Sequence, residues 1–208
     1  MMAATNQPST LSDLCETTGL PRATAHRLAT ALEAHRILTR TPDGKWTAGP
    51  ALPGNRDHIL EAAAPIMEEL LVTTGESIQL YQLTGNTRTC IASREPAQGL
   101  HNVVPVGRQL PLTSGSAARI IAAYENVDLQ GASFSAADVD AARTRGLSES
   151  IEEREAGLAS VSAPVLDAAG ALLGVLSISG SAERFRPSPI EKFGATLADA
   201  AARLSSAV

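Results

Sequence analysis

Apolar residues recur at helical spacing in two short stretches near the start of the chain. Between residues 10 and 18 they fall three and four positions apart, which predicts a short helix with a stripe of Leu11, Leu14 and Cys15. A sharp turn follows, because Gly19 can adopt positive φ and Pro21 suits the first turn of a helix. The second helix is predicted over residues 21–33, with a buried stripe of Ala25, Leu28, Ala29 and Leu32.

Two short extended segments come next, at residues 37–40 and 45–47. The residues between them, 41–44, include a proline and a glycine, which favours a tight hairpin. Two helices joined by a sharp turn and followed by a hairpin have the order of a winged helix-turn-helix, whose second helix reads DNA. Glycines and prolines at residues 49–54 interrupt the pattern, so we predict a DNA-binding domain over residues 1–56.

The rest of the chain, residues 57–208, mixes helical and extended patterns and is predicted to form a second domain. Helical spacing predicts four helices, at residues 58–74, 114–124, 135–145 and 188–204. Alternating or continuous apolar positions predict extended segments at residues 77–83, 87–93, 101–106, 158–166 and 172–179. Because several of these segments are joined by hairpin-length turns, the fold class is predicted to be α+β with a mainly antiparallel sheet.

Charge is distributed unevenly between the two predicted domains. The whole chain has a net charge of −5, yet residues 1–56 hold six basic and four acidic side chains, a net charge of +2, which leaves −7 on the remainder. Contacts with DNA phosphates are therefore expected in the first domain. The chain has no apolar run of the ~20 residues that a membrane span needs, and its start lacks a secretory signal, so we expect a cytoplasmic protein without membrane partners.

The candidate DNA-contacting residues lie on the second helix and in the hairpin. Hydrogen-bonding side chains on the outer faces of that helix have the reach needed for base edges and phosphates: Arg22, Thr24, His26 and Arg27. Arg40 and Lys45 would add positive charge in the wing, where a second phosphate backbone would lie.

Serine-rich, glycine-containing segments are the distinctive feature of the second domain, at residues 113–119, 152–160 and 177–180. Hydroxyls and free N–H groups at such turns could bind a small carboxylate. From the residues alone, a structural interpretation is favoured over this one. In that interpretation Ser114 caps a helix, and Ser160, Ser162, Ser177 and Ser179 are the outward positions of alternating strands.

Neither catalysis nor metal binding is predicted. The sequence has no GxSxG, HExxH, P-loop or GxGxxG motif, its four histidines are scattered, and Cys15 and Cys90 stand alone. We therefore expect a protein that is not an enzyme and that has no catalytic residues, no cofactor and no zinc or disulfide framework.

Seven motifs, in order along nearly the whole chain, resemble the isocitrate lyase regulator (IclR) family of bacterial transcription factors. They are Leu-Ser-Asp-Leu (11–14), Thr-Gly-Leu-Pro-Arg-Ala-Thr-Ala-His-Arg-Leu (18–28), Gly-Lys-Trp-Thr-Ala-Gly-Pro (44–50), Thr-Gly-Glu-Ser (74–77), Leu-Pro-Leu-Thr-Ser-Gly-Ser-Ala-Ala (110–118), Arg-Glu-Ala-Gly-Leu-Ala-Ser-Val-Ser-Ala-Pro-Val (154–165) and Ser-Ile-Ser-Gly (177–180). Within the family, the chain is most similar to actinobacterial regulators of leucine and other amino-acid biosynthesis genes.

This resemblance implies a winged helix-turn-helix, a connecting helix and a GAF-like effector-binding domain, assembled as a homodimer or a dimer of dimers on operator DNA. It places Ala23 at the major groove, beside the second-helix residues already named. It also implies an effector pocket, for a small carboxylate or an amino acid, at Ser116, Ala117, Ser150, Ser160, Ser177 and Ser179.

The chain departs from the family pattern at its start. Family members usually have a helix before the residue that matches Leu11, and residues 1–9 here are small, polar and expected to be disordered. An alternative function is therefore a GAF-like small-molecule-binding module that reads DNA poorly or not at all. A third hypothesis is an enzyme that uses the region of Ser116 or Glu153.

Overall fold

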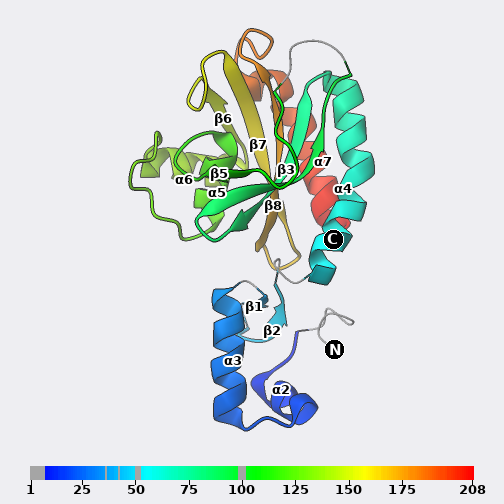
Figure 1. The fold of residues 1–208 in the computed structure, drawn as a ribbon, viewed down its shortest axis with the longest axis vertical. Coiled ribbons are helices and arrows are strands. Elements are labelled where there is room, and N and C mark those ends of the chain that lie inside the picture. Colours follow the sequence, from blue (N-terminus) through cyan, green and yellow to red (C-terminus); the bar gives the residue numbers. More distant parts are fainter. Residues whose placement is uncertain (1–7, 36, 42, 50–52, 98–101) are drawn as a thin grey trace. The chain divides into compact units, whose positions relative to one another are not determined.

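The computed structural model describes residues 8–35, 37–41, 43–49, 53–97 and 102–208, with the backbone alone for residues 53–57 (Figure 1). The chain divides into two compact units, Met1–Glu61 and Ala62–Val208. The division falls within helix α4 (Pro53–Thr74). Whether a helix precedes Leu11 concerns residues 1–7, which lie outside the described residues.

The first unit begins with helices α2 (Leu11–Thr18) and α3 (Arg22–Ala34). Thr10 caps α2: its hydroxyl accepts a hydrogen bond from the Asp13 N–H, and the Asp13 carboxylate accepts one from the Thr10 N–H at 2.7 Å. Gly19, with φ 69°, ends this helix in the left-handed conformation and sends the chain into α3. Both helices lie where the apolar spacing predicts them.

A two-stranded wing follows, formed by β1 (Leu38–Arg40) and β2 (Trp46–Ala48) in antiparallel register. Trp46 is 2% exposed and packs with Ala29 and Leu38, while Leu14 of α2 contacts the same cluster. The predicted stripe of α3 is wrong at two of its four positions. Ala25 and Ala29 are buried, whereas Leu28 and Leu32 are 46% and 37% exposed, because the small core under α3 is filled by Trp46.

The second unit contains a six-stranded antiparallel sheet with the order β5-β4-β3-β8-β7-β6. The central hairpins are β3 (Ser77–Thr84) with β4 (Thr87–Arg94), and β7 (Leu158–Leu166) with β8 (Leu172–Ser181). β5 (Gln109–Pro111) and β6 (Ser148–Ile151) form the edges. The antiparallel pairing of β3 with β8 joins the two hairpins, so strands from both ends of the unit meet at its centre.

Helices cover both faces of this sheet (Figure 1). α5 (Ser116–Tyr124) and α6 (Ala136–Arg145) pack on one face, where Ile120 and Ile121 enter a core shared with Val175. α4 and α7 (Pro189–Ser206) lie on the other face, joined by an ion pair of 2.6 Å between Arg203 and Glu69. This arrangement confirms the predicted α+β class with an antiparallel sheet.

Three element predictions need correction. Helix α4 begins at Pro53 rather than residue 58, since proline is compatible with the first turn of a helix. The predicted strand at 101–106 is not formed by the described residues 102–106; Val103 and Val106 are 58% and 61% exposed there, and the edge strand lies at 109–111 instead. Strand β6 was not predicted because its sequence, Ser-Glu-Ser-Ile, is too polar for an apolar pattern.

Candidate functional site

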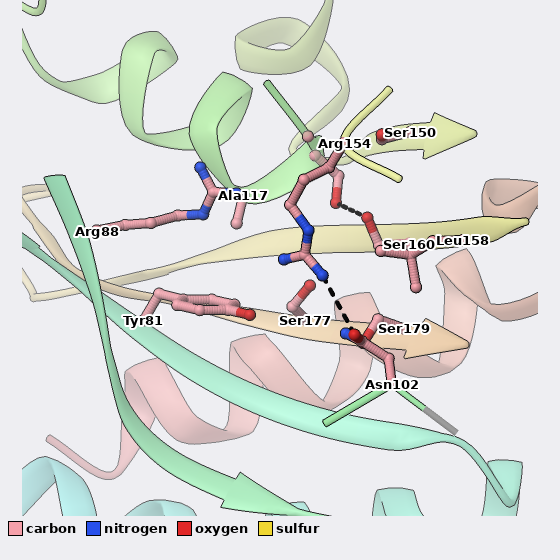
Figure 2. Close-up of a pocket in the computed structure, with 12 residues that line it drawn as sticks. Tyr81, Arg88, Asn102, Ala117, Ser150, Arg154, Leu158, Ser160, Ser177 and Ser179 are labelled. Carbon is pink, nitrogen blue, oxygen red and sulfur yellow. Dashed lines mark hydrogen bonds between the residues drawn. The ribbon is translucent and has the colours of Figure 1, made fainter. Parts of the chain in front are cut away.

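A pocket lies where the start of α5 faces strands β3, β7 and β8 in the second unit (Figure 2). The space between its walls, including the part open to solvent, is about 370 Å³. Its lining combines hydroxyls, an amide and two guanidinium groups, from Tyr81, Arg88, Asn102, Gly115, Ser116, Ala117, Ser150, Arg154, Leu158, Ser160, Ser177 and Ser179. Such a polar, partly enclosed lining suits a small hydrophilic ligand.

Four serines form a chain of hydroxyl contacts, and three of them line this pocket. The Ser116 hydroxyl lies 2.6 Å from that of Ser160 and 2.8 Å from that of Ser162, and Ser162 lies 2.8 Å from Ser177. The Ser177 hydroxyl donates to the Val161 carbonyl at 3.3 Å. Each hydroxyl has one proton and can reverse its direction, so the Ser160 end can donate to an anion or accept from a donor.

One wall of the pocket is the first turn of α5. Gly115 is the N-cap residue and no side chain caps the helix, which corrects the alternative prediction that Ser114 is an N-cap. With φ 92°, Gly115 adopts a backbone conformation that favours glycine, and a Cβ there would lie 3.3 Å from the Arg88 Nη2 atom. The uncapped first turn therefore presents N–H groups and the positive end of the helix dipole at the pocket.

Arg88 reaches this wall from β4 and is buried, with 2% of its surface exposed. One guanidinium nitrogen donates to the Pro111 carbonyl, and the Nε atom has no hydrogen-bond partner among the described residues. The guanidinium lies 5.8 Å from the centre of the Tyr81 ring. Burial lowers the pKa of Arg88 to about 10 and raises the pKa of Tyr81 to about 12, so Arg88 remains charged and Tyr81 neutral at pH 7.

Arg154 enters the pocket from the loop between β6 and β7, and Figure 2 shows its guanidinium pointing toward the strands. It donates to the Asn102 amide oxygen at 3.2 Å. The Asn102 amide nitrogen in turn donates to Ser179 at 2.9 Å, and the Ser179 hydroxyl donates to Gln79 at 2.8 Å. A polar network thus links this loop to the floor of the pocket on β3 and β8.

All six residues that the family resemblance places at the effector pocket lie together in this lining. The alternative prediction, that the strand serines point outward to solvent, is wrong, because Ser162, Ser177 and Ser179 are at most 3% exposed. Sequence reasoning missed Arg88 and Tyr81, although both occupy predicted strands at which an inward polar group could have been noted. Arg154 begins one of the family motifs given above. Its charge is the feature that distinguishes it from the serines predicted to line the pocket.

The predicted DNA-contacting residues divide into two groups in the first unit. On α3, Arg22, Ala23, His26 and Arg27 are exposed and Thr24 is half-buried. Of these, Arg22 contacts the Ser12 hydroxyl at 3.3 Å, while His26 and Arg27 make no hydrogen bond or ion pair with the other described residues. The outer face of α3 therefore presents cations that are available to phosphates or bases.

The two wing cations are engaged within the unit. The Arg40 guanidinium stacks 4.1 Å from the centre of the Trp46 ring and lies 3.6 Å from the Glu33 carboxylate. The Lys45 ammonium lies 2.8 Å from the Asp43 carboxylate, and this contact raises the pKa of Lys45 and lowers that of Asp43. Asp43 thus offsets part of the positive charge of the wing.

Comparison with known protein families agrees with both units. Residues 1–42 match the IclR helix-turn-helix domain, and residues 54–142 and 136–206 match the C-terminal domain of the bacterial transcriptional regulator IclR. The chain belongs to the IclR family. It is a DNA-binding transcriptional regulator of that family and not an enzyme.

Individual relatives span most of this regulator. The transcriptional regulator KipR of Bacillus subtilis is 27% identical over 96% of the chain and 90% of its own length. A crystal structure of an IclR-family regulator from Rhodococcus sp. is 27% identical, with a TM-score of 0.65 over 95% of this chain and 85% of that one. An IclR homologue from Microbacterium hydrocarbonoxydans, crystallised with 4-hydroxybenzoate, has the same fold at 22% identity, with a TM-score of 0.65 over 96% and 91% of the two chains.

Two further properties concern the described part of the regulator. No helix there is long and apolar enough to cross a membrane. The same residues contain no group of three or more His, Cys, Asp or Glu side chains that could hold a metal ion.

Proposed function

We propose that a small carboxylate or amino acid binds in the pocket of the second unit and changes the affinity of this regulator for operator DNA. One observation carries the proposal: serine hydroxyls, the uncapped start of α5 and two arginines converge on one enclosed polar space. Such donors are suited to a carboxylate. The relative that was crystallised with 4-hydroxybenzoate supports the same ligand class, since that molecule carries a carboxylate.

For the DNA side of the proposal, α3 enters the major groove with Arg22, Ala23, Thr24, His26 and Arg27, and Arg40 and Lys45 of the wing lie near the phosphates. We further propose that the regulator acts in the cytoplasm as a homodimer or a dimer of dimers, and that its targets include leucine or other amino-acid biosynthesis genes. The exposed cations of α3 support the placement of this helix against DNA.

The DNA side is tested by fluorescence anisotropy with the DNA upstream of the regulator's own gene, titrated over a range of salt concentrations. Affinity should fall steeply as salt rises, because bound phosphates release counterions. Arg27→Ala should weaken binding roughly tenfold, whereas the control Arg143→Ala, on the exposed surface of α6, should leave it unchanged. Equal affinity for this DNA and for random DNA would contradict specific regulation.

The ligand side is tested by thermal melting of the full chain with a panel of small acids and amino acids, followed by anisotropy with the compounds that stabilise it. Ser160→Ala removes a hydroxyl at the pocket end of the serine chain and should reduce the thermal shift. Ser206→Ala removes an exposed hydroxyl of α7 and should not. A panel that neither stabilises the chain nor alters operator binding would refute the proposal.

A further inference from the structure

We propose that Arg88 and Arg154 make the pocket selective for a small dicarboxylate over monocarboxylates and amino acids. This inference rests on the proposed function, because it names the chemical class of the effector that the same pocket takes. It goes further in assigning the selection to two residues that lie outside the serine cluster.

The charge of the lining is the first observation. Two of its twelve residues are arginines, and neither an aspartate nor a glutamate is among them. The two guanidinium groups repel each other, and this repulsion adds to the effect of burial in lowering the pKa of Arg88. Two like charges in a partly dehydrated space are unfavourable without anions, so a ligand with two negative charges complements the pocket best.

Two carboxylates on the loop that carries Arg154 are engaged elsewhere. Glu153 pairs with Arg119 at 2.7 Å and also accepts hydrogen bonds from the Gly115 N–H and the Ser133 hydroxyl. Glu152 accepts a hydrogen bond from the Gly157 N–H at 2.8 Å, in the turn before β7. Among the described residues, neither Arg88 nor Arg154 forms an ion pair with a carboxylate.

Arg88 marks the place for one carboxylate. Its guanidinium is held on one side by the Pro111 carbonyl, its Nε atom has no partner among the described residues, and its Nη2 atom lies beside Gly115. A carboxylate at this position would contact both the guanidinium and the uncapped first turn of α5. The buried Arg88 thereby gains the anionic partner that it lacks.

Arg154 marks the place for the other carboxylate. It donates to the neutral amide oxygen of Asn102 at 3.2 Å and also interacts with the neutral Tyr81 hydroxyl, and either contact can be exchanged for a stronger bond to a carboxylate oxygen. Figure 2 shows the Arg154 side chain inside the pocket, near both Tyr81 and Ser177. The polar groups of Asn102 and Ser179 would then remain linked to each other at 2.9 Å.

The same lining disfavours an amino acid. An ammonium group would enter a space that holds two guanidinium groups and no carboxylate, so it would meet repulsion and find only neutral acceptors.

Isothermal titration calorimetry on the full chain tests the proposal with matched acids. The pairs are malonate with propionate, succinate with butyrate, and glutarate with valerate, and aspartate serves as a succinate that carries an ammonium group. At least one dicarboxylate should bind ten- to a hundredfold more tightly than its monocarboxylate partner, because it adds one charge-assisted contact. Aspartate should bind at least tenfold more weakly than succinate.

Variants then identify the residue that binds the second carboxylate of the ligand. Arg154→Gln keeps amide donors near Asn102 but removes the charge, so the dicarboxylate should weaken at least tenfold and the monocarboxylate less than threefold. Arg154→Lys should restore part of the preference, and the control Arg143→Gln should change neither affinity. Arg88 is the buried member of the pair, so Arg154 is the better first target.

Two sets of results would overturn the inference. One is a monocarboxylate or aspartate that binds the unmodified chain as tightly as the matched dicarboxylate, or a panel in which no dicarboxylate binds. The other is an Arg154→Gln variant that weakens both classes equally. Anisotropy on operator DNA separates this inference from the proposed function: a monocarboxylate effector overturns only the selectivity, whereas a dicarboxylate that binds without changing DNA affinity overturns only the regulation.

Discussion

At the scale of single residues, the chemistry of the pocket depends on buried polar groups whose pKa values are shifted by burial. Tyr81 is 3% exposed, and burial raises its pKa to about 12 from the usual 10.0. Its contribution to stability is therefore fully present below pH 10 and is lost as the pH rises through about 12. Arg88 has the opposite effect in nearly the same window, because its pKa in the folded chain is lowered to about 10.

Because these two effects on stability oppose each other, the test is spectroscopic. The chain has two tyrosines, and the absorbance of tyrosinate should show one of them ionising near pH 12 while the protein is still folded. Tyr81→Phe should remove that step. An unchanged titration above pH 11 in this variant would contradict the assignment.

The wing offers a second prediction at this scale. Asp43 holds the Lys45 ammonium at 2.8 Å, so Asp43→Asn should free that charge and add one unit to the net charge of the first unit. Operator affinity at low salt should rise two- to fivefold, and the salt dependence should steepen by up to ~1 counterion, as measured by anisotropy. Asp140→Asn, which removes an exposed charge from α6, is the matched control and should have a smaller effect.

At the scale of elements, the start of α5 depends on a backbone conformation that only glycine adopts easily. Gly115→Ala should cost up to about 3 kcal/mol of unfolding free energy, and its Cβ would crowd the Arg88 guanidinium at 3.3 Å. Gly170, with φ 80° and open space around it, is a matched control in the turn between β7 and β8. Gly170→Ala should lose about 1–2 kcal/mol in chemical denaturation.

The two variants should differ in ligand binding, which calorimetry measures. Gly115→Ala should weaken dicarboxylate binding at least tenfold, because both the helix start and Arg88 must shift. Gly170→Ala should bind the ligand normally. If both variants retained full affinity, the first turn of α5 would have no part in the site.

Element positions were largely predictable from sequence, because apolar spacing and helix caps are local signals. The strand at 101–106 was misplaced and β6 was missed because pairing with a neighbouring strand, and not local composition, determines which residues form the sheet. Val103 is exposed, while polar Ser148 is buried against β7. For the pocket, the serines named from the family resemblance do line one space, but that resemblance did not include Arg88. Arg88 is recognised as a pocket residue only in the folded structure, where β4 pairs with β3 and the Arg88 guanidinium lies beside Gly115 at the start of α5.

At the scale of the whole molecule, regulation requires that the pocket of one unit and the DNA surface of the other be coupled through a free energy. Linkage makes that coupling reciprocal: if the effector changes operator affinity by some factor, saturating operator DNA must change effector affinity by the same factor. We expect a factor of roughly 5 to 150, typical of coupled sites. Anisotropy with and without the acid gives one value, and calorimetry with and without operator gives the other.

A variant separates this coupling from nonspecific effects of added acid. Arg27→Ala should lower operator affinity without altering calorimetric binding of the acid to the free protein, because Arg27 lies on α3 and the acid binds in the second unit. Arg154→Gln should do the converse, leaving operator affinity intact in the absence of acid while abolishing its response. Equal factors from the two titrations support a regulator with two linked sites, whereas unequal factors would mean that the acid acts on DNA binding at some other place.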